Sequence, residues 1–154
     1  MIQLVRPESG GSHQLKIVKL NLKDKLTSNF DTDNGILVSL KSQLTNKEVV
    51  FTPIANWGEG FYNERFATFF IYVSANVSNV NVGIIQMGTK DYPLGFYDVI
   101  IYQNSSPTNF DPSSLSVVYM GLANVSATTN AQSPTYTEYT TNDSDTENVY
   151  ITLN

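Results

Sequence analysis

The nine residues Gly95–Gln103, with the sequence GFYDVIIYQ, carry the clearest strand pattern in this chain. Aromatic and β-branched side chains dominate it, and both kinds favour the extended conformation of a β-strand. No glycine or proline interrupts it after Gly95. We therefore predict a strand over Gly95–Gln103.

Strand patterns also fill the residues before this stretch. Leu15–Leu22 alternates apolar and polar residues, as a strand with one buried face does. The dipeptide Asn34-Gly35 marks a tight turn, because both residues tolerate a positive φ angle. Ile36–Leu44 and Val49–Thr52 then read as a hairpin. The other expected strands on this side are Arg65–Val73 and Val80–Met87.

The residues after Gln103 continue in the same way. The run Asn109–Pro112 is typical of a loop, and Pro112–Leu115 is compatible with one short helical turn. The later expected strands are Leu115–Met120, Leu122–Ser126, Thr135–Thr140 and Val149–Leu153. These patterns give about eight to ten short strands and little helix, which predicts an all-β fold, either a β-sandwich or a barrel.

The length and the absence of cysteine limit the domain organisation. A chain of 154 residues without cysteine makes one domain whose core needs no disulfide or structural metal. We expect an N-terminal arm at 1–14 and a single β-sandwich domain at 15–154. The domain includes a polar, acidic loop at about 126–148.

Charge is divided unevenly along the chain. All nine lysine and arginine residues lie in residues 1–90 together with seven acids, whereas residues 91–154 contain seven acids and no base. The anionic part suits packing against a basic partner and repels nucleic acid. No run approaches the ~20 apolar residues of a membrane span, and the first eight residues lack the pattern of a secretory signal.

Catalytic and cofactor motifs are missing. The sequence has no phosphate-binding loop, no nucleophile elbow and no zinc-protease motif. His13 is the only histidine, and we expect it in the solvated arm rather than in a triad or a metal site. Asp98 interrupts an apolar strand, where an outward position explains it best. No enzymatic activity and no cofactor is expected.

Two further clusters carry chemistry that the sequence leaves open. Asp143, Asp145 and Glu147 place carboxylates at alternate positions, which suits Ca²⁺, although the glycine and the terminal glutamate of an EF-hand are absent. A solvated acidic surface is the preferred interpretation. Trp57, Phe61 and Tyr62 could form a platform for a sugar ring, or Trp57 could close one end of a sandwich core.

Several runs together resemble small structural proteins of tailed bacteriophages that infect Bacteroidetes, including crAss-like phages. These runs occur in order over about residues 36–154. They are Leu37–Phe51, Asn63–Phe66, Leu94–Gln103, Thr108–Pro112, Val117–Gly121, Tyr136–Tyr139 and Val149–Ile151.

The resemblance implies a non-enzymatic virion component with an immunoglobulin-like or related sandwich. It carries over no catalytic residues. We expect an auxiliary or decoration protein on the capsid shell, assembled in the host cytoplasm, whose partners are capsid or other virion proteins and further copies of itself. The alternatives are a head–tail connector or tail component, and a module that binds carbohydrate or the host surface.

The charge division then suggests an orientation on the particle. The acidic residues after position 90, among them Asp143, Asp145 and Glu147, would face away from packaged DNA or toward a basic capsid surface. The basic residues near the N-terminus would face acidic neighbours. The expected docking residues on that side are Arg6, Lys16, Lys19, Lys23 and Lys25.

Overall fold

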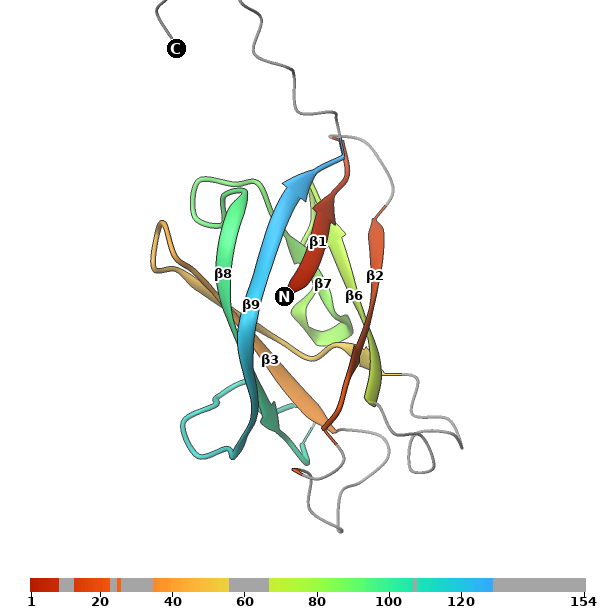
Figure 1. The fold of residues 1–154 in the computed structure, drawn as a ribbon, viewed down its shortest axis with the longest axis vertical. Helices are drawn as coiled ribbons and strands as arrows, with labels where there is room; N and C mark the ends of the chain where they lie inside the picture. The colour runs from red at the N-terminus through yellow and green to blue at the C-terminus, as the bar shows by residue number, and fades with distance from the viewer. Residues whose placement is uncertain (9–12, 23–24, 26–34, 56–66, 107, 129–154) are drawn as a thin grey trace, which may run out of the picture.

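The structure of the protein is a computed structural model, which describes residues 1–8, 13–22, 25, 35–55, 67–106 and 108–128 (Figure 1). The described residues are almost entirely β-strand and turn, with one short 3-10 helix, η1, at Val80–Val82. The strands are β1 (Ile2–Arg6), β2 (Gln14–Leu20), β3 (Ile36–Ser42), β4 (Glu48–Phe51), β5 (Ile54–Ala55), β6 (Ala67–Ser74), β7 (Ile84–Gln86), β8 (Gly95–Gln103) and β9 (Val117–Ala127).

These strands form two sheets that pack face to face. The five-stranded sheet has the order β1-β9-β8-β3-β4, and the four-stranded sheet has the order β2-β6-β5 with β7 also paired to β6. All pairs are antiparallel except β1 with β9 and β6 with β7. The all-β sandwich expected from the strand pattern is confirmed.

The orders β9-β8-β3-β4 and β2-β6-β5 match the orders G-F-C-C′ and B-E-D of immunoglobulin-type sandwiches. Strands β3, β4, β8 and β9 occupy the places of C, C′, F and G, and β2, β5 and β6 those of B, D and E. Strand β7 is an addition between E and F. The likeness is one of strand order, because the chain lacks the cysteines and β3 lacks the strand-C tryptophan of antibody domains.

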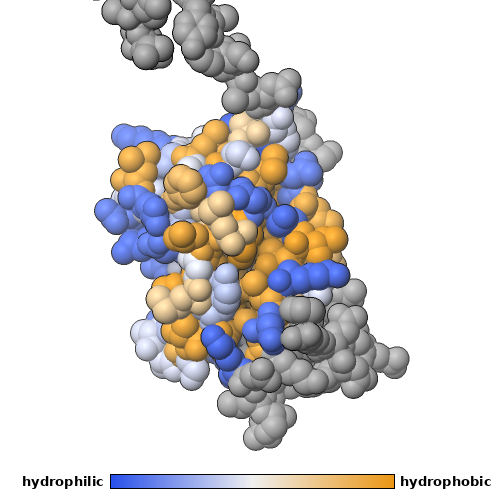
Figure 2. Space-filling model, in the orientation of Figure 1, coloured by the Kyte–Doolittle hydropathy of each residue, from blue (hydrophilic) through white to orange (hydrophobic). Residues whose placement is uncertain are grey.

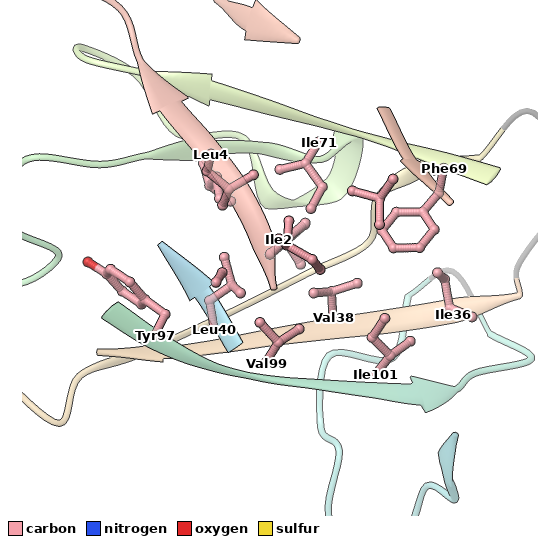
Figure 3. Close-up of a cluster of buried hydrophobic side chains, with 14 of the residues drawn as sticks. Ile2, Leu4, Ile36, Val38, Leu40, Phe69, Ile71, Tyr97, Val99 and Ile101 are labelled. Carbon is pink, nitrogen blue, oxygen red and sulfur yellow. The ribbon is translucent and has the colours of Figure 1, made fainter. Parts of the chain in front are cut away.

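The core lies between the inward faces of the two sheets. Strict alternation on β6 and β8 gives each strand one row of buried side chains. Figure 3 shows Val38, Val99 and Ile101 of the five-stranded sheet pointing toward Phe69 and Ile71 of the four-stranded sheet. Each of these five side chains is at most 1% exposed. Burial of apolar area, roughly 25 cal/mol per Å², is the main term that holds such a sandwich together.

The N-terminal residues differ from the arm expected at 1–14. Ile2–Arg6 forms edge strand β1, which pairs with β9, and Ile2 and Leu4 are buried in the core. The backbone N–H of Thr128 donates a hydrogen bond of 3.0 Å to the carbonyl oxygen of Arg6 and extends the pairing. Two alternating apolar residues, Ile2 and Leu4, are too few for the sequence pattern to distinguish a strand from a solvated arm. His13 is exposed next to β2.

Tyr97 closes one end of the core (Figure 3). Its side chain is fully buried, and its hydroxyl donates a 2.6 Å hydrogen bond to the carbonyl oxygen of Pro93, four residues upstream. This is the tyrosine corner that immunoglobulin-like sandwiches carry at the start of strand F. Val99, two residues further on, is buried where antibody domains have their second cysteine. Burial is the main cause that raises the pKa of Tyr97 to about 12.

Strand β9 replaces the two separate strands expected at Leu115–Met120 and Leu122–Ser126, so that expectation was wrong. Gly121 lies inside β9 and does not end the strand. Glycine is needed there for packing, because a Cβ at this position would collide with the ring of Tyr119. The pairing with β8 skips Val118, which is a β-bulge that turns both Val118 and Tyr119 toward the core. The glycine makes room for an aromatic ring.

The strand expected at Val80–Met87 is also shorter than the pattern indicated. Its first half is the 3-10 helix η1, and Gly83 follows with a positive φ of 68°. The backbone around Pro53 lies 3.0–3.2 Å from where a Cβ of Gly83 would stand. A chain reversal at Gly83 therefore leaves only Ile84–Gln86 to pair with β6.

The loop between β8 and β9 matches its prediction. The Asn109 side chain accepts a 2.9 Å hydrogen bond from the backbone N–H of Asp111, and Asp111 accepts one of 2.9 Å from that of Ser113. The bond from the Ser113 backbone lowers the pKa of Asp111. Asn104 is buried and donates to the carbonyl of Asn109. The side chains of Asn109 and Asp111 thus stabilise this loop by accepting hydrogen bonds from backbone N–H groups two residues further on, as such residues do in turns.

Replacing Tyr97 by phenylalanine tests the tyrosine corner. The Tyr97→Phe variant loses the bond to Pro93, so we expect it to lose about 1–2 kcal/mol of unfolding free energy at neutral pH. The neutral phenol is favoured in the folded state, so wild-type stability is full below the ordinary tyrosine pKa and falls as the pH rises from about 10 to about 12. With a shift of this size the loss is roughly 2–3 kcal/mol. Urea unfolding across this range measures both effects.

The outcome that contradicts this role is equal alkaline destabilisation in the two proteins, because the other tyrosines titrate in both. Tyr102 serves as a control: it lies on the opposite face of β8 and is partly exposed. Tyr102→Phe should leave most of the alkaline loss in place.

A larger side chain at Gly121 tests the packing under β9. We expect Gly121→Val to lower the unfolding free energy by about 1–3 kcal/mol, because the Tyr119 ring must leave its position. In a Tyr119→Ala background the same substitution should cost clearly less. Chemical denaturation of the four proteins gives the coupling energy. Additive losses would show that Gly121 and Tyr119 do not compete for the same space.

Candidate functional site

The outer face of the four-stranded sheet carries apolar side chains that the core does not use. We call it the lysine face. It comprises Leu15, Ile17 and Lys19 of β2, Ile54 of β5, Thr68, Phe70 and Tyr72 of β6, and Ile84 and Gln86 of β7. Register pairs place Ile17 and Ile54 on either side of Phe70, and Leu15 and Ile84 on either side of Tyr72. The apolar residues therefore form one continuous surface over four strands.

Exposure on the lysine face is substantial. Ile17 is 50% exposed, Leu15 is 41% exposed and Ile54 is 38% exposed. The opposite side of β2 supplies Val18 to the core at 4% exposure. Strand β2 is therefore apolar on both faces, although its sequence had suggested one buried face and one polar face. Contiguous exposed apolar surface of this kind marks interaction sites more often than isolated apolar residues do.

The electrostatics of the lysine face are simple. Lys19 is exposed at its edge, opposite Thr68 of β6. Among the described residues no acidic side chain lies on this face. The face therefore offers apolar contact with one positive charge, which suits an apolar partner surface bordered by carboxylates.

The outer face of the five-stranded sheet is a second exposed surface. We call it the mixed-charge face. Its apolar residues are Phe96, Ile100 and Tyr102 of β8, Val117, Met120 and Leu122 of β9, and Val50 of β4. Met120 is 69% exposed, Phe96 53%, Val117 50% and Leu122 44%. In Figure 2 hydrophobic residues gather in several groups on the side of the molecule that the view shows, between hydrophilic ones.

Charged residues of both signs cross the mixed-charge face in one row. Lys41 of β3 is the register partner of Glu48 on one side and of Asp98 on the other. The Asp98 carboxylate accepts a 2.7 Å hydrogen bond from the side-chain amide of Gln43 and is exposed, in the outward position expected for it. Glu48 accepts a hydrogen bond from the buried hydroxyl of Ser39. Alternating signs on neighbouring strands stabilise the sheet modestly.

The basic residues expected to form one docking side are spread over different surfaces. Lys19 lies on the lysine face, whereas Lys16 is half-buried on the opposite side of β2, paired with inward-facing Ile71. Arg6 ends β1 in the other sheet, and its side chain lies against Gly88. Lys25 is exposed beyond β2. The period of two along a strand separates Lys16 from Lys19, which the linear sequence brings close.

Other expected site residues lie outside the described part of the chain. These are Lys23, the aromatic candidates Trp57, Phe61 and Tyr62, and the acidic candidates Asp143, Asp145 and Glu147. The strands expected at Thr135–Thr140 and Val149–Leu153 and the loop at about 126–148 also fall wholly or mostly outside it. These expectations stay predictions.

The described residues contain no group of three or more histidine, cysteine, aspartate or glutamate side chains that could hold a metal ion. In the same part of the chain no helix has the length and apolar character needed to cross a membrane.

The exposed residues Phe96, Met120 and Leu122 were not among the sequence-based candidates. A signal existed for Phe96, because the run GFYDVIIYQ carries apolar residues on both of its faces. Tyr97, Val99 and Ile101 fill the core, and Phe96 and Ile100 point the other way. A strand that is apolar on both sides needs either a second buried layer or a partner.

Comparisons with known proteins give no family for this chain. No protein-family model matches it, and no match was found among the curated proteins or the solved structures.

Proposed function

We propose that this protein is a non-enzymatic structural component of a bacteriophage particle, an auxiliary or decoration protein that binds the capsid shell through its lysine face. The observation that carries the proposal is the continuous exposed apolar surface of Leu15, Ile17, Ile54, Phe70 and Tyr72. The resemblance of several sequence runs to phage structural proteins supplies the biological setting.

The energetics of the lysine face support binding to a protein surface. Burial of exposed apolar area contributes roughly 25 cal/mol per Å² before the costs of association. Because these side chains come from hydrogen-bonded strands, little conformational entropy is lost when they dock. Lys19 at the edge would select a capsid surface that presents a carboxylate near an apolar patch.

The sandwich itself suits a reinforcing role. Its core joins strands that are distant in sequence, such as β1 with β9, and the tyrosine corner ties the start of β8 to its preceding loop. A domain held in this way can bridge capsid subunits without changing shape. The work needed to separate those subunits under internal DNA pressure then rises by the binding free energy. The mechanism needs no cofactor, and its setting is the virion assembled in the bacterial cytoplasm.

The two alternatives gain nothing from the described residues. Sugar or host-surface binding depends on Trp57, Phe61 and Tyr62, which lie outside them. A head–tail connector or tail component would use the same kinds of sheet face, arranged in a ring. Imaging of purified particles that carry a labelled copy of the protein separates these placements. A decoration protein occupies many sites on an icosahedral lattice, whereas a connector forms a ring.

Charge reversal on the lysine face tests the docking side. We expect Ile17→Asp and Lys19→Glu each to raise the dissociation constant for particles at least about tenfold, which corresponds to roughly 1.4 kcal/mol, and so to reduce the occupancy. Both residues are exposed, so the melting temperature should change little. Lys47→Glu is the matched control, since Lys47 is equally charged and exposed but lies in the β3–β4 turn.

The measurement is quantitative mass spectrometry of purified particles that were reconstituted with each variant. Unchanged occupancy for both variants of the lysine face would reject this face as the docking side. Particles that lack the protein should also lose subunits at a lower temperature. Equal heat resistance with and without the protein would reject the reinforcing role.

A further inference from the structure

The structure points to a second interaction surface. We infer that the mixed-charge face binds a second copy of the same chain, so that the protein is a twofold symmetric dimer in solution. This inference does not depend on the capsid proposal, because it concerns the opposite sheet and the isolated protein.

The apolar part of the mixed-charge face includes side chains more exposed than those of the lysine face. Met120 is 69% exposed and Phe96 is 53% exposed, more than any apolar side chain of the lysine face. Ile100, next to Met120 in the register, is half-buried. Exposed surface of this composition favours association with another apolar face.

The charges of this face select a second copy as the partner. The lysine face has only one described charge, Lys19, and so offers no opposite charge to a second copy. The mixed-charge face instead holds Lys41 directly beside Asp98, on neighbouring strands. A surface that carries both signs side by side can be complementary to itself about a twofold axis, where each contact occurs twice.

The register shows which residues of the mixed-charge face lie in line and so which a second copy could meet. Glu48, Lys41, Asp98 and Leu122 form one row across β4, β3, β8 and β9, and Val50, Ser39, Ile100 and Met120 form the adjacent row. A twofold axis between β3 and β8, parallel to the strands, places β3 over β8 of the second copy and β4 over β9.

In this arrangement Lys41 faces Asp98 of the second copy, twice in each dimer. Met120 faces Val50 of the second copy, and Leu122 faces Glu48, whereas Ser39 is buried below this contact. Pairing of strand with strand at a small angle is the usual way in which two sheets pack. The opposite charges fix the register, and the apolar residues supply the burial.

A charge-swap experiment tests this arrangement on the purified full-length protein. Asp98→Lys leaves two lysines at the contact, and Lys41→Asp leaves two aspartates. We expect each variant alone to dissociate with a dissociation constant at least about tenfold higher than wild type. An equimolar mixture of the two should regain the dimer, because each lysine then faces an aspartate.

Sedimentation velocity measures the association of each protein, and native mass spectrometry of the mixture identifies the heterodimer. Lys47→Asp is the control for the charge change, and it should dimerise as the wild type does. Met120→Glu should weaken the dimer without lowering the melting temperature, since its side chain is exposed.

A wild-type protein that stays monomeric at about 100 μM overturns the inference. Equal dimerisation of the wild type and both single charge variants also overturns it. Failure of the mixture to form a heterodimer rejects the paired contact of Lys41 with Asp98. None of these outcomes bears on capsid binding through Lys19.

Discussion

The packing of β8 and β3 against β6 is the constraint on which the rest of the structure depends. These three strands supply Val38, Val99 and Ile101 from one sheet and Phe69 and Ile71 from the other, and all five side chains are buried. No disulfide can fix the distance between the sheets, because the chain has no cysteine. Burial of apolar area must therefore set both the distance and the register, since a shift by one residue would turn each inward row toward solvent.

Tyr97 extends this constraint to the end of the sandwich. Its ring fills the space beyond Leu40 and Val99, and its hydroxyl bonds to the Pro93 carbonyl and so fixes the direction from which the chain enters β8. The outward positions of β8 follow from this entry. Phe96, Asp98 and Ile100 have no freedom to turn inward while Tyr97 is anchored. The composition of the mixed-charge face is thus a consequence of how the core is closed.

Periodicity predicted the strands well where a strand has one buried row and failed where local geometry intervenes. Gly95–Gln103 agrees with β8 residue by residue, and the β3–β4 hairpin was also expected. Gly121 suggested a break, yet in β9 it makes room for Tyr119. Ile2 and Leu4 belong to the core only because β9 offers its free edge, a long-range pairing that no local pattern contains.

The candidate sites show the same limit more sharply. The cluster of lysines near the N-terminus was attractive because its members are close in sequence, but strand geometry places Lys16 and Lys19 on opposite sides of β2. The mixed-charge face arose from the reverse situation, since Lys41, Asp98 and Met120 are distant in sequence and adjacent only through the register. A linear charge pattern describes long-range steering, whereas contact surfaces need the pairing of strands.

The two faces differ in a way that suits two kinds of contact. The lysine face carries one described charge, Lys19, so its preferred partner is an apolar surface that presents a carboxylate near its edge. The charges of the mixed-charge face alternate in sign along one row, so each can face an opposite charge on a second copy. A sandwich with these properties on opposite sheets can bind a shell through one sheet and a neighbouring copy through the other. Such a dimer carries two lysine faces. Once one of them is bound to the shell, the effective concentration of the other at the shell rises, so two weak contacts give tighter binding.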